Sequence, residues 1–486
     1  MKENRKAGET MLNVKNLTVS FNDDIGNGTV VNDLSFCLNK GEILALVGES
    51  GSGKSMTALS IIGLLKKNEK VQGKLDLDGV ELTELSKKER REYMGDDIAI
   101  IFQEPMTSLN PVTRVGKQVE EMIKLHPNTF DHKLNKAEMK EKVIEMFEKV
   151  DLPEPDKIYS KYPHELSGGM RQRVMIAMAT ICNPRILIAD EPTTALDVQT
   201  QEQILSLLKR INDEKKISIL MITHDLNVVE NLADRIIVMH NGKMVEEGTK
   251  DEVLYSPKEE YTKTLIASVP KGIKEKEEKS EEIIVETKDL SIYYKEGTKK
   301  HFVINNLSFQ IHKGEILGLV GRSGLGKTTI SKTLLGIHKN YIGTVINNAK
   351  HSQMVFQDPF SSLNPSKTIG WILEEPLRIR EKLSNQERRE KVEEMLVKVG
   401  LTKDYAKRKP SELSGGQRQR INIALAVISG ADFIIADEPV SALDVTIQSQ
   451  ILKLLLSLQK EYGLSMLFIS HDIHVIDKMC DRILKI

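Results

Sequence analysis

Gly48-Glu49-Ser50-Gly51-Ser52-Gly53-Lys54-Ser55 has the spacing G-x-x-x-x-G-K-S, and the chain repeats it as Gly321-Arg322-Ser323-Gly324-Leu325-Gly326-Lys327-Thr328. An apolar run precedes each copy, at 43–47 and 316–320, and a helix-like run follows, at 56–65 and 329–335. This strand–loop–helix order is typical of a phosphate-binding P-loop, whose backbone N–H groups and helix N-terminus face the anion. The lysine reaches the outer phosphates, and the Ser or Thr hydroxyl binds magnesium. Residues 48–55 are the first P-loop and residues 321–328 the second.

Four further phrases occur twice at a single offset of 247 residues. They are L-S-G-G at 166–169 and 413–416, A-D-E-P at 189–192 and 436–439, A-L-D at 195–197 and 442–444, and H-D at 224–225 and 471–472. A fixed offset across separate motifs indicates a duplicated domain. The run at 271–282 is nearly all Lys, Glu, Ser and Gly, which predicts a solvated linker between a first domain at 11–270 and a second at 283–486.

Alternating apolar and amphipathic segments predict the fold class of each half. Strand-like runs at 186–189 and 217–223 flank a helix-like run at 199–211, which favours an α/β layered core around a parallel sheet. Regions 113–163 and 369–410 are rich in Lys, Glu and Met at helical spacing, and we interpret them as an inserted helical subdomain. The prediction is therefore two tandem P-loop NTPase domains of the α/β class.

Bulk composition excludes several classes of function. The chain has 486 residues, a net charge of -1 and ordinary hydrophobic (40%) and charged (29%) content, so it carries no overall basic footprint for nucleic acid. Its three cysteines are far apart without a C-x-x-C, which argues against a zinc site or a disulfide framework. The apolar stretch at 421–436 is interrupted by polar residues, so we expect no direct membrane span.

Two acidic pairs complete the chemistry that nucleotide hydrolysis requires. The buried-strand runs at 186–190 and 433–437 end in Asp190 and Asp437, where a carboxylate can help to hold Mg²⁺. The adjacent Glu191 and Glu438 are candidates for polarising the attacking water. ATP and Mg²⁺ are therefore the expected cofactors.

The phrase L-S-G-G-x-R-Q-R at 166–173 and 413–420 lies between each P-loop and its Asp-Glu pair, and here the chain resembles the ATP-binding cassette family over nearly all of both halves. The resemblance implies two cassettes packed head to tail, with each ATP between one half's P-loop and the other half's signature phrase. Site one would combine Lys54, Ser55, Gln103, Asp190, Glu191 and His224 with Ser414, Gly415, Gly416 and Gln417. Site two would combine Lys327, Thr328, Gln357, Asp437, Glu438 and His471 with Ser167, Gly168, Gly169 and Met170.

The resemblance also implies roles outside the P-loops. Gln103 and Gln357 would sense magnesium and a partner permease, and His224 and His471 would contact the γ-phosphate. The remaining implied positions are the aromatic residues that stack on adenine, Phe21 and Tyr294.

The chain departs from the family pattern at a few positions. Met170 stands where the signature usually has glutamine, so site two is expected to lose one polar contact. Arg322 and Leu325 make the second P-loop less standard. Ile486 aligns with Met239, so the second half is expected to be C-terminally shortened.

The phrase S-L-N-P, at 108–111 and 362–365, is similar to the ATPases of oligopeptide, dipeptide and nickel importers, as is Y-T-K-T-L at 261–265. That resemblance implies two permease subunits, an extracytoplasmic solute-binding protein and a peripheral position on the cytoplasmic face of the membrane. The alternative is a soluble two-cassette translation factor, which would carry a long charged helical arm between its domains. A DNA-repair cassette ATPase would show zinc-type cysteine clusters or long coiled coils.

Overall fold

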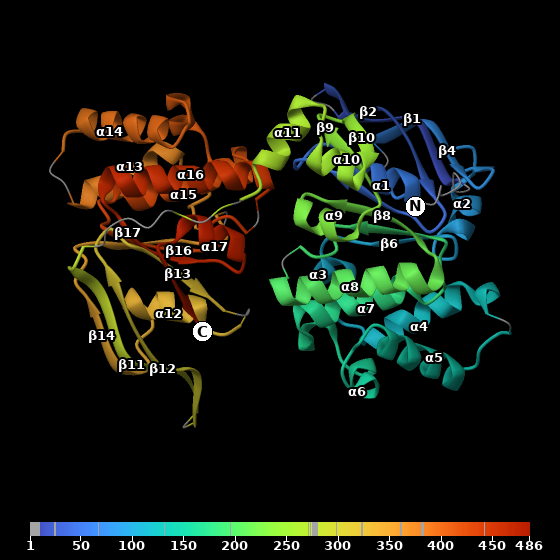
Figure 1. The fold of residues 1–486 in the computed structure, drawn as a ribbon, viewed down its shortest axis with the longest axis horizontal. Helices are drawn as coiled ribbons and strands as arrows, with labels where there is room; N and C mark the ends of the chain where they lie inside the picture. The colour runs from blue at the N-terminus through green and yellow to red at the C-terminus, as the bar shows by residue number, and fades with distance from the viewer. Residues whose placement is uncertain are drawn as a thin grey trace. The chain divides into compact units, whose positions relative to one another are not determined.

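The computed structural model describes residues 10–486 except 24–25, 67, 131, 195, 271, 273, 275–279, 298, 322–323, 360–361, 381–382 and 442, and excludes the side chains of 22–23, 26–27, 105–106 and 380. It divides into unit one, Met1–Ala267, and unit two, Ser268–Ile486. Within each unit, helices cover the faces of a central sheet (Figure 1). Among the described residues, no helix has both the length and the apolar character needed to cross a membrane.

The central sheet of unit one has the strand order β10-β9-β3-β8-β7-β6. Its strands from β9 to β6 are parallel, and β10 pairs with β9 in the antiparallel direction. The bounds in chain order are β3 Ile43–Val47, β6 Ile98–Ile101, β7 Ile186–Asp190, β8 Ser218–Thr223, β9 Arg235–His240 and β10 Lys243–Thr249. The first P-loop thus leaves the carboxyl end of an interior strand, where α/β sheets bind ligands.

Unit one also contains an antiparallel sheet of order β2-β1-β4-β5. Its strands are β1 Thr10–Asp23, β2 Gly26–Asn39, β4 Glu69–Leu77 and β5 Val80–Glu81. One hydrophobic cluster joins this sheet to one face of the central sheet through Ala58 and Ile61 of α1. The P-loop helix therefore packs between two sheets, which fixes its N-terminus at the carboxyl end of β3.

Unit two repeats this arrangement. Its parallel sheet has the order β15-β16-β17-β13-β18, and its antiparallel sheet has the order β12-β11-β14. The bounds are β11 Ile283–Glu296, β12 Lys299–His312, β13 Ile316–Val320, β14 Tyr341–Asn347, β15 Ser352–Val355, β16 Phe433–Asp437, β17 Ser465–Ile469 and β18 Arg482–Lys485. The parallel strands β6 to β9 and β3 of unit one correspond in order to those of unit two, as a duplicated domain predicts.

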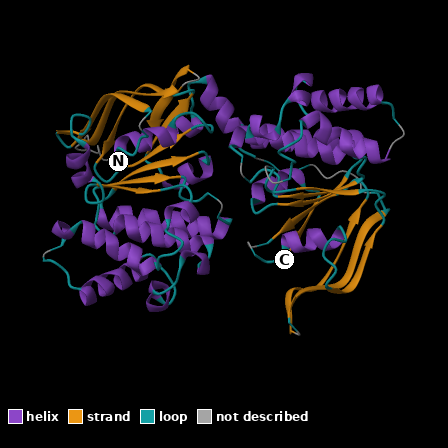
Figure 2. Cartoon of the chain, turned by 180° about the vertical axis from the view of Figure 1, so that it is seen from behind, coloured by secondary structure: helices purple, strands orange, loops and turns teal. Residues whose placement is uncertain are grey.

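The helices are interspersed with the strands along the chain, and Figure 2 shows them packed beside the sheets. Those of unit one are α1 Lys54–Ile62, α2 Lys87–Tyr93, α3 Pro105–Ser108, α4 Val115–Leu125, α5 Lys136–Lys149, α6 Pro155–Tyr159, α7 Gly168–Thr180, α8 Val198–Lys215, α9 Leu226–Leu232, α10 Lys250–Tyr255 and α11 Glu260–Ala267. Those of unit two are α12 Lys327–Leu334, α13 Ile369–Arg380, α14 Asn385–Lys398, α15 Gly415–Ile428, α16 Val445–Tyr462 and α17 Ile473–Met479. Short 3-10 turns lie at Pro127–Thr129, Pro163–Glu165, Lys403–Lys407 and Pro410–Glu412. Helices α4 to α6 lie between β6 and β7, and α13 and α14 lie between β15 and β16, within the regions predicted as insertions. The predicted α/β fold with an inserted helical subdomain is thereby confirmed.

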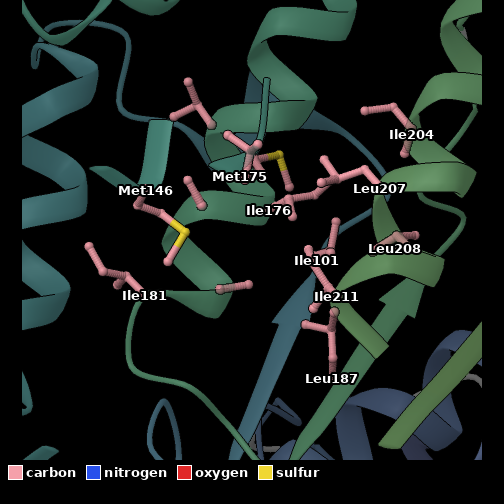
Figure 3. Close-up of a cluster of buried hydrophobic side chains, with 14 of the residues drawn as sticks. Ile101, Met146, Met175, Ile176, Ile181, Leu187, Ile204, Leu207, Leu208 and Ile211 are labelled. Atoms are coloured by element: carbon pink, nitrogen blue, oxygen red, sulfur yellow. The ribbon is translucent and has the colours of Figure 1, made fainter. Parts of the chain in front are cut away.

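Alternation along the buried strands sends side chains to two separate cores. Leu187 and Ala189 of β7 join α7 and α8 on one face, whereas Ile186 and Ile188 join the α1 side. Figure 3 shows the first of these cores, in which Ile101 and Leu187 from the strands lie beside Met175 of α7 and Ile211 of α8. Burial on both faces explains why the strands are continuous apolar runs.

Two predicted boundaries differ from the structure. Helix α1 begins at Lys54 rather than 56, because Gly53, at φ 99°, is its N-cap, and it ends before Gly63, at φ 78°. Helix α8 continues to Lys215 rather than 211 and is capped by the side chain of Asp197, which accepts a hydrogen bond from the Thr200 N–H.

Lys274 does not fit the expectation of a solvated linker. Its ammonium lies 2.8 Å from a carboxylate oxygen of Asp481, and both side chains are below a tenth exposed. Its backbone N–H donates to the Asp477 carbonyl. Sequence composition overlooked this pairing because Asp481 is distant in sequence. Residues 271, 273 and 275–279 of the predicted linker lie outside the described residues.

Candidate functional site

The first P-loop folds around the ammonium group of Lys54. Its Nζ lies 2.8 Å from the carbonyl oxygens of Gly48 and Glu49 and 3.3 Å from Ser52 Oγ. A Cβ at Gly48 would lie 2.2 Å from the Met239 carbonyl oxygen, and one at Gly53 would lie 2.8 Å from the Val30 carbonyl oxygen. These close approaches and positive φ angles require glycine, so the loop is held tightly enough to present its backbone N–H groups to an anion.

The second P-loop has the same form in unit two. Lys327 Nζ lies 2.7 Å from the Gly321 carbonyl oxygen, and Gly326, at φ 90°, is the N-cap of α12. Gly324 has a positive φ and open space around it, and Leu325 is partly exposed. Arg322 and Ser323 lie outside the described residues.

Each P-loop hydroxyl meets the aspartate at the end of the neighbouring strand. Ser55 Oγ donates to Asp190 across 3.1 Å, and Thr328 Oγ1 donates to Asp437 across 2.8 Å. Burial, together with the charge of Glu191, raises the pKa of Asp190 to about 6. Burial likewise raises the pKa of Asp437. Burial and a neighbouring negative charge destabilise the ionised form of such a carboxylate, and a divalent cation would relieve that cost, so the group is a favourable cation ligand.

Glu191 is held by side chains from three segments. Its carboxylate accepts hydrogen bonds from Gln103 Nε2 at 2.7 Å and Thr194 Oγ1 at 2.9 Å, and His224 Nδ1 lies 3.0 Å from Oε1. Burial alone would raise the pKa of Glu191, but the hydrogen bond and charge of His224 outweigh it, so the pKa lies below its ordinary value. The carboxylate is therefore ionised at neutral pH, as a general base requires.

Backbone geometry places both glutamates at the same point. Glu191 and Glu438 each have φ of 47°, in the left-handed region. The Glu191 N–H donates to the Ile222 carbonyl and the Glu438 N–H to the Ile469 carbonyl, each on the adjacent parallel strand. This turn aims the carboxylate at the histidine that follows that strand.

In unit two the glutamate is held more loosely. Gln357 Nε2 donates to the Glu438 carboxylate across 2.7 Å, but His471 Nδ1 is 3.4 Å away. Ser441 Oγ donates to the backbone carbonyl of Glu438 across 3.2 Å, where the equivalent Thr194 reaches the carboxylate of Glu191. Thr194 and Ser441 were not predicted from the sequence; their place three residues after each glutamate, within one turn, is the signal that could have found them.

Each signature phrase starts a helix. Ser167 and Ser414 are the N-caps of α7 and α15, and each hydroxyl accepts a hydrogen bond from the backbone N–H of Met170 or Gln417, respectively. The exposed serines and the glycines that follow, Gly168 and Gly169 in α7 and Gly415 and Gly416 in α15, form helix N-termini of the kind that bind anions.

The glutamine of the second signature bonds within its own unit. Gln417 Oε1 accepts from the Ser414 N–H at 3.0 Å, and its Nε2 donates to the Tyr405 hydroxyl at 2.9 Å. At the offset of 247 residues, Gln417 corresponds to Met170 and Tyr405 to Ile158 in unit one. Apolar residues therefore stand in unit one where unit two has this hydrogen-bonded pair. Ile158 is buried and Met170 packs against the same core. The lost contact at Met170 is thus one that caps and anchors a helix.

The two candidate stacking aromatics differ in their surroundings. Tyr294 is 45% exposed, and its hydroxyl lies 3.1 Å from Thr329 Oγ1 on α12. Phe21, near the end of β1, is half-buried. Both lie on the antiparallel sheet that packs against the P-loop helix of their unit.

These residues fit Mg²⁺ and a nucleotide. Among the described residues, no group of three or more His, Cys, Asp or Glu side chains could form a metal site of their own. One hydroxyl and one carboxylate in each unit leave the remaining oxygen ligands to phosphate and water, as Mg²⁺ commonly has them. Glycine at 48, 53 and 326 lets each loop pass close to neighbouring residues that a Cβ would clash with, which keeps the backbone around each lysine compact.

Comparison with known proteins gives the family. The ABC transporter family matches residues 31–194 and 304–441. The chain belongs to the ABC transporter family. The glutathione import ATP-binding protein GsiA of Escherichia coli O157:H7 and that of Escherichia coli K12 are each 41% identical to it over 97% of this chain and 84% of theirs. The resemblance to the cassette family is thereby confirmed, and the chain is an ATPase that uses ATP and Mg²⁺.

Solved structures support the same fold. A chain in the complex of archaeal ribosomal stalk protein aP1 with archaeal ribosome recycling factor aABCE1 has a TM-score of 0.66 and 23% identity, over 96% of this chain and 86% of that one. RNase-L inhibitor has a TM-score of 0.63 and 24% identity, over 94% and 85%. At these identities the likeness extends to the tandem-cassette fold alone.

Replacing Asp190 should stabilise the nucleotide-free ABC ATPase. The rise of its pKa from 3.8 to about 6 means that the charged form costs the folded state on the order of 2–3 kcal/mol at neutral pH. Asp190→Asn should therefore raise the melting temperature without ligand but reduce the further rise produced by Mg²⁺ with ATP, because only the second P-loop would still bind them fully. Calorimetry with and without Mg²⁺-ATP measures both effects, and Asp213→Asn, an exposed position on α8, is the control. A lower melting temperature without ligand would contradict the expectation.

Met170→Gln alone should change ATP turnover little. A glutamine at 170 could cap Ser167 but would find Ile158 where Gln417 finds Tyr405. We expect the double variant Met170→Gln with Ile158→Tyr to raise ATP turnover more than Met170→Gln alone. The difference should correspond to the free energy of about one hydrogen bond, ~0.5–1.5 kcal/mol. Steady-state ATP hydrolysis by both variants and by Ile158→Tyr measures it. Equal turnover in all three would show that the anchor is irrelevant.

Proposed function

We propose that this chain is the ATPase of an importer for peptides or related small solutes, metal complexes included. The observation that carries the proposal is 41% identity, over 97% of the chain, to proteins named as glutathione import ATP-binding proteins. The twice-repeated S-L-N-P phrase supports the same group. The cassettes would be 11–270 and 283–486, joined by 271–282.

ATP would bind at two composite sites. Each P-loop would receive the phosphates, and the signature serine and glycines of the other cassette would close over them from a second helix N-terminus. The Lys54 and Lys327 ammonium groups, now bonded to loop carbonyls, would turn to the outer phosphates. When bound, Mg²⁺ would neutralise charge on the phosphates. Ser55 with Asp190, and Thr328 with Asp437, would hold it.

Glu191 and Glu438 would act as the proton acceptors in hydrolysis. In the present structure Oε2 of Glu191 accepts hydrogen bonds from Gln103 and Thr194, and Oε1 lies 3.0 Å from His224 Nδ1. Because a carboxylate oxygen can accept two hydrogen bonds, Oε1 retains acceptor capacity for an attacking water, and turning His224 toward a γ-phosphate would expose it further. Gln103, which is exposed on the loop after β6, would then report nucleotide occupancy to a permease.

Closure of the cassettes on ATP would move two attached permease subunits between inward- and outward-facing states, with an extracytoplasmic solute-binding protein supplying cargo. The chain would work as a peripheral protein on the cytoplasmic face of the membrane. The support for the alternative, a soluble translation factor, is fold similarity to a structure that contains a ribosome recycling factor, at 23% identity. The higher identity to import proteins favours the importer.

The test is co-expression with candidate importer permeases, followed by solubilisation and purification. A stable complex whose ATPase activity rises with loaded binding protein is expected. Gln103→Ala and Gln357→Ala should keep ATP hydrolysis but lose its stimulation by the loaded binding protein. Gln72→Ala, at an exposed position of β4, is the control and should keep both. Absence of any permease association together with co-sedimentation with ribosomes would overturn the proposal in favour of the translation factor.

A further inference from the structure

The ring of Tyr294 lies beside the second P-loop. It belongs to β11, and its hydroxyl lies 3.1 Å from the hydroxyl of Thr329, two residues after Lys327 on the first turn of α12. Thr329 is buried at 8% exposure, whereas Tyr294 is 45% exposed. The buried partner therefore fixes one end of a ring whose remaining surface is open next to the phosphate cradle.

A second aromatic ring confines Tyr294 from another direction. The centroid of the His338 imidazole is 4.9 Å from that of Tyr294, and the planes are tilted by 55°. His338 Nε2 lies 3.1 Å from the carbonyl oxygen of Tyr293, which can only accept, so this nitrogen carries the proton. His338 is thus anchored to the same strand that carries Tyr294, and the two rings are held in one relative orientation.

The first P-loop has none of these polar anchors. At the offset of 273 residues that relates the P-loops, Tyr294, Thr329 and His338 correspond to Phe21, Met56 and Leu65. The alignment holds through the end of the helix, because Gly63 and Gly336 both follow it with positive φ. Phe21 has no hydroxyl, and Met56 and Leu65 have no hydroxyl or imidazole to contact its ring. The aromatic ring at the first P-loop therefore lacks the hydrogen bond and the adjacent histidine that hold Tyr294.

We propose that Thr329 and His338 are positioning residues that hold Tyr294 ready to stack on the nucleotide base at the second P-loop. The consequence is asymmetric base recognition: the second P-loop gains affinity from the purine through a ring that is already oriented, while Phe21 must be ordered on binding. Ordering a side chain at a binding site lowers affinity, and a pre-oriented one avoids that cost. The inference rests on the proposed function, in which the second P-loop binds ATP.

Equilibrium binding to the full chain carrying Lys54→Ala, which weakens the first P-loop, tests this inference with two probes. ATP has a base and inorganic tripolyphosphate does not, and both are used with Mg²⁺. Thr329→Val should raise the Kd for ATP by about three- to tenfold, the loss of one hydrogen bond, and leave the Kd for tripolyphosphate unchanged. His338→Leu should act in the same direction, and Thr329→Ser should restore ATP affinity.

A reciprocal variant guards against a purely structural effect. Phe21→Tyr with Met56→Thr and Leu65→His, in a chain carrying Lys327→Ala, should lower the Kd for ATP but not for tripolyphosphate at the first P-loop. Equal weakening of both probes by Thr329→Val, or no change in either, would overturn the inference. If the Lys54→Ala parent binds neither probe, the second P-loop does not take ATP, and the proposed function fails along with the inference.

Discussion

Glu191→Gln is expected to slow ATP hydrolysis at the first P-loop by about 10²–10⁴-fold while ATP binding persists. The Glu191 carboxylate is only 12% exposed, and His224 keeps its pKa below the ordinary value, so it can accept a proton at neutral pH. Glutamine has the same shape and can still accept the hydrogen bonds of Gln103 and Thr194. It cannot accept a proton from water, which is why the chemical step alone should suffer.

Single-turnover phosphate release and nucleotide affinity measure the two effects separately. Comparing a Glu438→Gln chain with the double variant isolates the contribution of the first P-loop. Glu214→Gln makes the same chemical change at an exposed position on α8 and should leave the rate unaltered. Normal turnover in the double variant would rule out Glu191 as the base, and loss of ATP binding would show that its role is structural.

Lys54→Ala should weaken ATP binding at the first P-loop by about 10- to 100-fold, and Lys327→Ala should do so at the second. A hydrogen bond to a charged group contributes ~1.5–3 kcal/mol, and that range sets the expectation. Both lysine residues are buried, at 5% and 7% exposure, so no water-exposed charge can replace theirs. Each substitution acts within its own unit, so one of the two ATP sites should remain.

Titration calorimetry gives affinity and stoichiometry together. The unsubstituted chain should bind two ATP, and each variant one with native affinity. Lys66→Ala, at an exposed position after α1, is the control for loss of a single positive charge. Unchanged affinity and stoichiometry in both P-loop variants would contradict their assignment as phosphate cradles.

Much of the fold followed from local pattern. The five-residue apolar runs at 43–47 and 316–320 coincide with β3 and β13, because a strand buried on both faces is apolar at every position. The boundaries of α1 and α8 were less well predicted. Caps such as Gly53 and Asp197 depend on backbone angles and side-chain contacts that periodicity does not express.

Some residues of the candidate site were likewise predicted from the sequence, and others were found only in the structure. Motif spacing pointed to the lysines, the aspartates and the glutamates, since phosphate and magnesium impose a fixed set of groups. Thr194 was not found although it lies within one turn of Glu191. Tyr405, Thr329 and His338 were not found because nothing in their spacing marks them as partners of Gln417 or Tyr294. Lys274 was misjudged as solvated for the same reason.

Composition and repeated motifs were thus sufficient for the family, the duplication and the core of each P-loop. These depend on short stretches whose backbone must bind phosphate, so the chemistry is written locally. The sequence predicted an asymmetry at Met170, but the contacts that produce asymmetry between the halves emerged only from the tertiary structure. A hydrogen bond such as that between Gln417 and Tyr405, or between Tyr294 and Thr329, joins elements that are separate in the chain, and folding alone decides which side chains come within bonding distance.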